Sequence, residues 1–206
     1  MNSQNILDRE FYNRDALIVA KELLGKLLVH EINGQMISLK IVETEAYMGI
    51  EDKAAHSYGG RRTNRVEVMY GEPGFSYVYF VYGMHYLFNI VTRERGNPQA
   101  VLIRAGEPVK GLDLIAHNRF GIPYEKLNKI QLINLTNGPG KLSKALSITK
   151  ELNGEDLCGN KLYVTEGEKE TFSIVSAKRV GIDYAEEAKD YPWRFYIKGN
   201  TYVSIK

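Results

Sequence analysis

Three side chains that could carry out acid–base or stacking chemistry lie at alternate positions of one segment. Glu43, Glu45 and Tyr47 occupy positions i, i+2 and i+4 of QMISLKIVETEAY, residues 35–47. In a β-strand this spacing directs all three side chains to one face of the sheet. Two carboxylates beside an aromatic ring, just before a long loop, predict the rim of an active site. The alternative interpretation is a solvated strand face that is simply acidic.

His56 follows in AAHS, and three kinds of chemistry compete for this cluster. Glu43, Glu45, Asp52 and His56 could bind a divalent metal, although no ligand motif such as HExxH supports that. The two carboxylates could instead act as acid and base on a glycosidic bond. In the third interpretation, one carboxylate activates a water molecule while aromatic rings hold a flat substrate. We favour the third, because it uses more of the sequence and no nucleotide-loop or serine-hydrolase motif competes.

The aromatic rings for such a pocket come from GFSYVYFVYGMHYLFN, residues 74–89, which contain four tyrosines and three phenylalanines. Two apolar arms flank Tyr82-Gly83, so the segment predicts a β-hairpin. Burial explains aromatic residues in the arms but poorly explains a tyrosine at the tip. A rigid ring on a projecting hairpin suits a wedge between stacked bases. The alternative is an edge hairpin whose tip folds back on the core.

Basic residues flank this hairpin in the sequence. Arg61, Arg62 and Arg65 precede it, and further arginines follow it. A basic triplet in a loop is often only a solvated surface, but beside an exposed aromatic residue it becomes a candidate phosphate contact. The net charge is only +2, so the chain permits a nucleic-acid partner without requiring one.

The elements expected to position these residues indicate an α+β fold. We expect a helix over 14–25, with Asn13 as its N-cap and Gly25 as its stop. A hairpin over 27–47 around Asn33-Gly34 follows. Next come a long loop (49–73), the aromatic hairpin and a strand over 100–105. The remaining expected helices cover 107–118, 124–131 and 184–189, with one more from Gly140. Short strands are expected near KLYV, FSIVSA, RFYI and YVSI. We predict a single domain over 1–206, loosely ordered over 1–12. It has a curved, mostly antiparallel sheet with packed helices and a protruding aromatic hairpin.

Composition places few further limits on function. Of the 206 residues, 44% are hydrophobic and 25% charged, which is ordinary for a globular domain. The single cysteine, Cys158, excludes an intramolecular disulfide and a zinc site built from cysteines. The first fifteen residues have no apolar core, so we expect no signal peptide, and the interrupted hairpin is no convincing membrane span. We therefore expect a cytoplasmic protein.

Five motifs in order resemble the alkyladenine (3-methyladenine) DNA glycosylase family. They are ETEAY with AAHS, YVYFVYGM with Asn89, VLIRAGEP, NGPGKLSKAL, and RVGI followed by WRFYIKGN, and together they cover about residues 15–205. The chain looks like a bacterial member, without the long N-terminal extension of the vertebrate ones. The stretch 93–98 looks slightly longer than in those members.

The resemblance implies a role for each matching residue. Glu45 would deprotonate the attacking water, with Arg104 and the main-chain carbonyl of Val180 helping to hold that water. The remaining implied residues bind the damaged base or the DNA: Tyr47, His56 and Tyr79 as stacking walls, backbone near Ala54 and His56 at the base edge, Asn89 against the exocyclic amine of guanine, and Tyr82 as the minor-groove wedge. We expect a monomeric enzyme without a metal or other cofactor. Its expected partner is double-stranded DNA with damaged purines, at the nucleoid.

Physical reasoning supports the same function. Extruding a nucleotide from a duplex costs a few kcal/mol, and stacking on aromatic rings returns roughly 1 to 3 kcal/mol per base. Face-on rings also favour cationic, alkylated purines. Two other hypotheses stay open from the sequence: a non-catalytic nucleic-acid-binding or RNA-modifying protein, and a metal-dependent hydrolase built on Glu43, Glu45 and His56.

Overall fold

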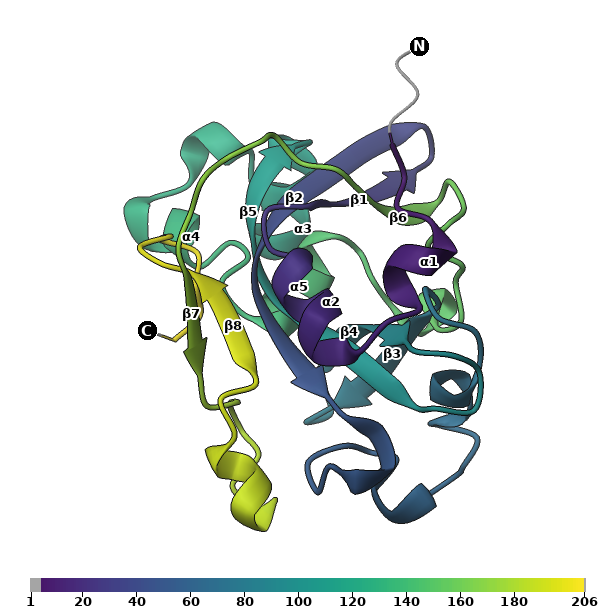
Figure 1. The fold of residues 1–206 in the computed structure, drawn as a ribbon. Helices are drawn as coiled ribbons and strands as arrows, with labels where there is room; N and C mark the ends of the chain where they lie inside the picture. The colour runs from purple at the N-terminus through teal and green to yellow at the C-terminus, as the bar shows by residue number, and fades with distance from the viewer. Residues whose placement is uncertain (1–4, 206) are drawn as a thin grey trace.

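The computed structural model describes residues 5–205, which form one domain around a curled, antiparallel eight-stranded sheet (Figure 1). The strand order is β3-β4-β5-β2-β1-β6, and β8 pairs with both β2 and β7. The strands are β1 (Leu27–Ile32), β2 (Gln35–Tyr47), β3 (Ser76–Val81), β4 (His85–Thr92), β5 (Gln99–Lys110), β6 (Leu162–Thr165), β7 (Ile174–Ala177) and β8 (Arg194–Ile197). The α+β class and the curved antiparallel sheet predicted from the sequence are confirmed.

The strand β2 is the centre of this architecture because it pairs with three others. Asn33 and Gly34 both have positive φ, at 50° and 78°, which is the turn that joins β1 to β2 as predicted. The far end of β2 pairs with β8 through Glu43↔Tyr196 and Glu45↔Arg194, while β5 lies along its other edge. The segment that carries the two carboxylates is therefore held between two strands.

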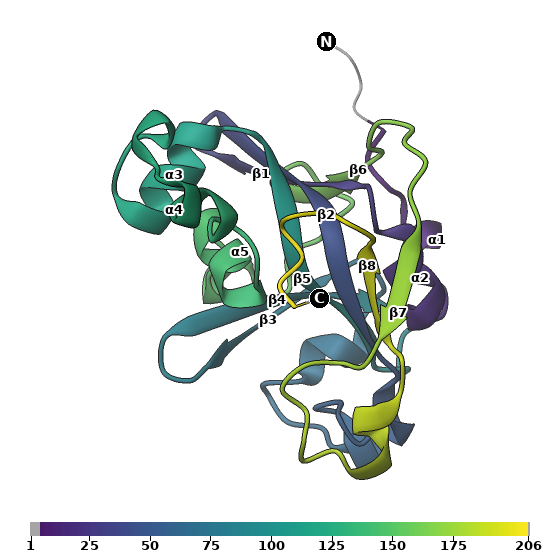
Figure 2. The ribbon, with the colours of Figure 1, turned by 90° about the vertical axis from the view of Figure 1, so that its left-hand side faces the viewer.

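Helices cover both sides of the curled sheet. Figure 2 shows α1 and α2 on one side and α3, α4 and α5 on the other. The α-helices are α1 (Arg9–Tyr12), α2 (Ala16–Glu22), α3 (Leu112–Phe120), α4 (Lys129–Ile133) and α5 (Pro139–Ala145), and the 3-10 helices are η1 (Gly49–Glu51), η2 (Tyr58–Gly60), η3 (Glu67–Tyr70), η4 (Tyr124–Lys126), η5 (Lys150–Leu152) and η6 (Glu186–Asp190). The main core lies between these layers and includes fully buried Leu39, Ile41, Phe88 and Ile103.

Several sequence-based boundaries are wrong. Residues 9–12 form α1, capped by Asp8 and ending in fully buried Tyr12, so this part of the N-terminal segment is well packed; residues 1–4 lie outside the described part. The expected helix over 14–25 is the shorter α2, which Asp15 caps through its bond to the Leu17 N–H. Strand β5 continues to Lys110 and β2 pairs with it along that length, so α3 begins later than expected. In the described residues near YVSI, no strand forms. The helix expected over 124–131 is divided into η4 and α4.

The loop over 49–73 contains the short 3-10 helices η1, η2 and η3. Beyond it, β3 and β4 pair from Ser76↔Ile90 to Val81↔His85. Both Tyr82 and Gly83 in the connecting turn have positive φ, at 52° and 67°. This conformation is uncommon for a tyrosine, and the Tyr82 side chain finds little packing, with 83% of its surface exposed. In the described residues, no helix is both long and apolar enough to cross a bilayer.

Candidate active site

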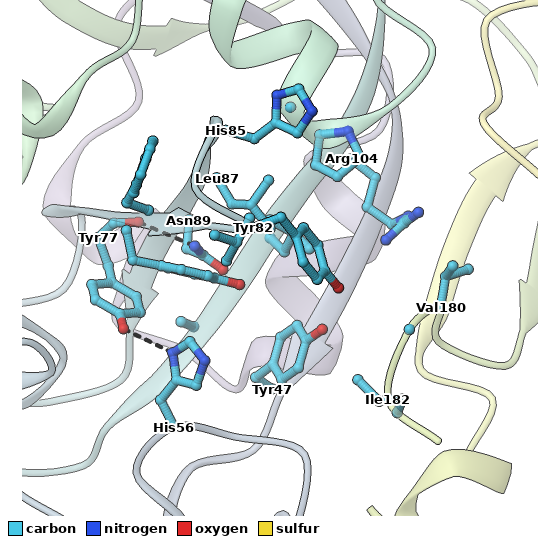
Figure 3. A pocket seen from close by; sticks show the side chains of 18 of the residues that line it. Tyr47, His56, Tyr77, Tyr82, His85, Leu87, Asn89, Arg104, Val180 and Ile182 are labelled. Carbon is cyan, nitrogen blue, oxygen red and sulfur yellow. Dashed lines mark hydrogen bonds between the residues drawn. The ribbon is translucent and has the colours of Figure 1, made fainter. Parts of the chain in front are cut away.

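A cavity of about 800 Å³ opens beside the end of β2. Its walls come from the β3–β4 hairpin, from β5 and from the segment after β7 that includes Val180 and Ile182 (Figure 3). Of the residues predicted for the site, Tyr47, Ala54, His56, Arg65, Tyr79, Tyr82, Asn89, Arg104 and Val180 line this cavity. Segments that are distant in the sequence thus meet around one hollow.

Glu45 is a fully buried carboxylate with two hydrogen-bond donors and one ion pair. Its Oε1 accepts the main-chain N–H of Val180 at 2.8 Å and lies 3.2 Å from Nη1 of Arg104. Its Oε2 accepts the hydroxyl of Tyr47 at 2.9 Å. Burial raises the pKa of Tyr47, and the Glu45 charge raises it further, so the hydroxyl keeps its proton and donates. The carboxylate is therefore held in one orientation.

Glu43 lies on the same face of β2, shares Arg104 with Glu45 and otherwise binds different partners. Its Oε1 accepts from Arg104 Nε at 3.1 Å, from Arg194 Nη1 at 3.0 Å and from the Ser204 hydroxyl at 3.0 Å. Its Oε2 accepts the main-chain N–H of Ser204 at 2.7 Å. Burial alone lowers the pKa of Arg104, but the charges of Glu45 and Glu43 outweigh this and the net direction is upward. Glu43 therefore orients Arg104 and binds the C-terminal segment.

The other walls of the cavity are mostly aromatic. The rings of His56 and Tyr79 meet edge to face, with centroids 4.6 Å apart, and those of Tyr77 and Tyr79 are 5.1 Å apart. His56 Nδ1 lies 2.8 Å from the Tyr77 hydroxyl. Burial lowers the pKa of His56 to about 4, and the nearby charges of Arg65 and Arg61 add to this. The imidazole is thus neutral at pH 7, and the pocket wall carries no charge there.

Two smaller residues complete the cavity wall. Asn89 is buried, and its Nδ2 donates to the main-chain carbonyl of Tyr77 at 3.1 Å, across the β3–β4 pair. The main-chain N–H of Ala54 donates to Asp52 Oδ1 at 3.0 Å, and its carbonyl accepts the Tyr184 hydroxyl at 3.3 Å. Both residues therefore have fixed positions at the cavity surface.

Comparison with known proteins agrees with this geometry. The sequence profile described as Methylpurine-DNA glycosylase (MPG) matches residues 10–201. The chain belongs to this family. A protein of Desulfitobacterium hafniense is 74% identical over 200 residues, which is 97% of this chain and 98% of the relative. A protein of Clostridium acetobutylicum is 60% identical over 199 residues, with 97% of each chain covered. Both carry the words 3-methyladenine DNA glycosylase in their names.

Membership of the methylpurine-DNA glycosylase family makes the chain a hydrolase of N-glycosyl bonds that acts on DNA and removes alkylated purines. The hypothesis of a non-catalytic or RNA-modifying protein is therefore not retained. The resemblance noted from five sequence motifs is confirmed, and the matched range nearly coincides with the one those motifs covered.

The three arginines predicted to contact DNA differ in their surroundings, although all are exposed. The Arg65 guanidinium lies 5.1 Å from the centre of the Tyr79 ring, at the cavity of the glycosylase. Arg61 borders a smaller adjoining hollow with Lys53 and Tyr184. Arg62 forms an ion pair with Glu67 at 2.6 Å. The structure thus brings Arg65, but not Arg62, to the cavity.

The residues of the metal hypothesis have other partners. Glu43 and Glu45 bind arginines, as described above. Asp52 forms a two-point ion pair with Arg179, and His56 contacts Tyr77. Within residues 5–205 no group of three or more histidine, cysteine, aspartate or glutamate residues is arranged to hold a metal ion. The acidic cluster of the glycosylase is thus built around arginines.

Sequence reasoning missed several residues of the glycosylase site. One is Tyr77, which lines the cavity and contacts His56. Arg179 and Asp52, 127 residues apart, form a fully buried ion pair next to Tyr47. No spacing signal links such distant positions. The one available clue was that RVGI places Arg179 directly before Val180.

Proposed function

We propose that this glycosylase flips damaged purines into the cavity and releases them by attack of a water molecule that Glu45 activates. The proposed substrates are 3-methyladenine and, in addition, the neutral lesions hypoxanthine and ethenoadenine. The observation that carries the proposal is the position of Glu45 directly behind three residues that line an aromatic cavity, Tyr47, Arg104 and Val180.

An acceptor site for that water follows from counting lone pairs. An ionised carboxylate has about four acceptor positions, two on each oxygen. Oε1 has one hydrogen-bond donor, the Val180 N–H, and an ion pair with Arg104, while Oε2 has one donor, from Tyr47. Glu45 itself is fully buried, but its partners Tyr47, Arg104 and Val180 line the cavity. In the proposal, a water molecule reaches the free position on Oε2 from that side. Glu45 would accept the proton of that water as the bond to the sugar forms.

The charges around Glu45 suit a cationic transition state. Breaking an N-glycosyl bond develops positive charge on the sugar, and a fixed carboxylate stabilises that charge. Arg104 pairs with both Glu45 and Glu43, and Arg194 also pairs with Glu43. Arg104 would therefore position Glu45 and the water.

The aromatic walls explain the preference for alkylated bases. Tyr47, His56 and Tyr79 present rings at the cavity, and attraction between a cation and a ring face is worth about 0.5 to 2 kcal/mol. The neutral form of His56 avoids repelling a cationic purine. Asn89 would reject guanine, whose exocyclic amine would approach it.

The exposed ring of Tyr82 supports the flipping step. It stands at the end of the β3–β4 hairpin and also borders the cavity (Figure 3). In the proposal it enters the minor groove and fills the space that the extruded nucleotide leaves. Arg65 and Arg61 would contact nearby phosphates. We propose a cytoplasmic, monomeric enzyme on double-stranded DNA, and sedimentation at micromolar concentration tests the monomer.

Base release from a lesion panel tests the proposed function. Duplexes that carry a single 3-methyladenine analogue, hypoxanthine or ethenoadenine are incubated with the full chain and divided into two portions, one of which is treated with alkali. Strand breaks that appear only after alkali identify monofunctional base release. Free base from methylated DNA without release of hypoxanthine or ethenoadenine would contradict the wider substrate range. Activity that EDTA abolishes would contradict the metal-free mechanism.

A further inference from the structure

Two half-buried cations at the cavity have no acidic partner. Arg119 from α3 and Lys141 from α5 both line it. Among the described residues, no carboxylate oxygen lies within 4.0 Å of a side-chain nitrogen of either residue. Within residues 5–205, Arg65 also lines the cavity without an ion pair, but it is exposed and lies over the Tyr79 ring. The buried Arg104 pairs with Glu43 and Glu45.

The groups that do bind these two cations are neutral oxygens on one loop. The Lys141 ammonium donates to Asn134 Oδ1 at 2.7 Å and to Asn137 Oδ1 at 2.8 Å. The Arg119 guanidinium donates to the main-chain carbonyls of Leu135 and Asn134, at 2.8 Å and 3.1 Å. Asn134 thus connects the two cations. An ammonium has three donors and a guanidinium five, so both keep donors for a ligand.

The electrostatic consequence is a shortage of negative charge. Both side chains are half-buried, and burial lowers the pKa of Lys141, with the like charge of Arg119 adding to the effect. Partly desolvated like charges held beside one another are costly unless an anion binds them. The oxygens of a phosphate are the natural ligand for such a pair in a DNA-binding protein.

We propose that Arg119 and Lys141 together bind one DNA backbone phosphodiester next to the nucleotide that enters the cavity, an inference that rests on the proposed function. Their position fits this role. Gly140 packs so closely against the first residue of β4 that a Cβ there would lie 2.8 Å from the His85 ring. The start of α5, which carries Lys141, and the Tyr82 turn therefore border the same cavity, and the two elements that carry them are in contact.

The first test is the salt dependence of DNA binding. Affinity for a duplex with a stable abasic-site analogue is measured from 50 to 300 mM salt for the parental chain, Lys141→Met and Lys141→Arg. The control is Lys144→Met, which removes an exposed charge of the same helix that does not line the cavity. Lys141→Met should weaken binding roughly tenfold at low salt and reduce the salt slope by about 1. Lys141→Arg, which keeps the positive charge, should show the parental salt slope, and so should Lys144→Met.

A second test locates the phosphate. Single backbone phosphates around the abasic analogue are replaced by neutral methylphosphonates, and each duplex is titrated with the parental chain and with Lys141→Met. At the contacted phosphate, the substitution should weaken parental binding but leave Lys141→Met binding unchanged. Arg119→Met should lose its response at the same phosphate. Responses at two separate phosphates would contradict a shared site.

Other outcomes separate this proposal from its alternatives. If Lys141→Met lowers the melting temperature but keeps the parental salt slope, Lys141 only connects the loop to α5 and the proposal is overturned. If inorganic phosphate raises the melting temperature of the parental chain, but not of Lys141→Met, while the DNA slope is unchanged, the site binds free phosphate. If the parental chain releases base but Lys141→Met has the parental salt slope, only the phosphate site is rejected. If the parental chain releases no base, the proposed function is rejected.

Discussion

The Arg179 guanidinium lies 4.8 Å from the centre of the Tyr47 ring and 4.9 Å from that of Trp193. Its two terminal nitrogens bind Asp52 at 2.5 Å and 2.8 Å, and the side chains of both partners are fully buried. The next residue, Val180, donates its N–H to Glu45. One buried ion pair therefore fixes both an aromatic wall of the cavity and a donor to the carboxylate proposed as the base.

Asp52→Asn should destabilise the protein by about 3 kcal/mol, because it leaves the Arg179 charge buried without a counter-charge. Urea unfolding, followed by the fluorescence of the single tryptophan, Trp193, measures this. The double variant Asp52→Asn/Arg179→Met should be more stable than Asp52→Asn alone, since it removes the unpaired charge. A loss below about 1 kcal/mol in the single variant would contradict a structural role for the pair.

Glu45→Gln should reduce base release by at least about 100-fold, since general-base catalysis typically contributes 10² to 10⁴. Affinity for lesion duplex should stay close to the parental value, because the aromatic walls are unchanged. Arg104 retains Glu43 as a partner, so the fold should persist. Single-turnover release and a binding titration on the same duplex measure the two effects. Base release at the parental rate would exclude the proposed role.

The sequence predicted the parts of this fold that depend on local patterns. The Asn33-Gly34 turn and the alternation over 35–47 correctly placed Glu43, Glu45 and Tyr47 on one face. Boundaries failed where tertiary pairing outweighed local preference. The end of β5 is an example: residues 107–110 were expected to begin a helix, but they pair with β2 through Lys40↔Glu107 and Ser38↔Lys110.

The site was predictable only where its residues lie in recognisable motifs. The buried pairs that organise it join distant segments, such as Glu43 with Arg194 and Asp52 with Arg179. A single sequence contains no signal for such pairing. The same limit applies to the candidate DNA contacts. Arg62 was chosen because it lies near the hairpin in sequence, yet it pairs with Glu67, while Lys141 lines the cavity from a separate helix.

Tyr82→Ala should weaken binding to lesion duplex by roughly 5- to 150-fold, as expected when one stacking ring worth about 1 to 3 kcal/mol is lost. The folded protein should lose little stability, because the ring is 83% exposed. Tyr82→Phe is the matched control and should bind almost as the parental chain does. Fluorescence anisotropy with lesion and undamaged duplexes measures the change. Equal affinities of the alanine and phenylalanine variants would rule out the wedge.

His56 should make stability depend on pH over a defined window. Burial, followed by the charges of Arg65 and Arg61, lowers its pKa to about 4 in the folded protein, against 6.5 for an unperturbed histidine. Between these values the unfolded chain binds more protons than the folded one, so the free energy of unfolding rises with pH. This contribution is complete above about pH 6.5 and is lost as the pH falls toward 4.

Urea unfolding of the parental chain and of His56→Gln at intervals from pH 7.5 to 4.5 isolates this contribution, because other titrating groups cancel in the difference. The parental chain should lose stability relative to the variant as the pH falls below about 6.5. Arg65→Gln should narrow the window from below and reduce the loss of stability, since it removes one of the charges that lower the folded-state pKa of His56. Parallel curves for the parental chain and His56→Gln would mean that the imidazole titrates normally. The neutral wall proposed for cationic purines would then be absent below pH 6.5.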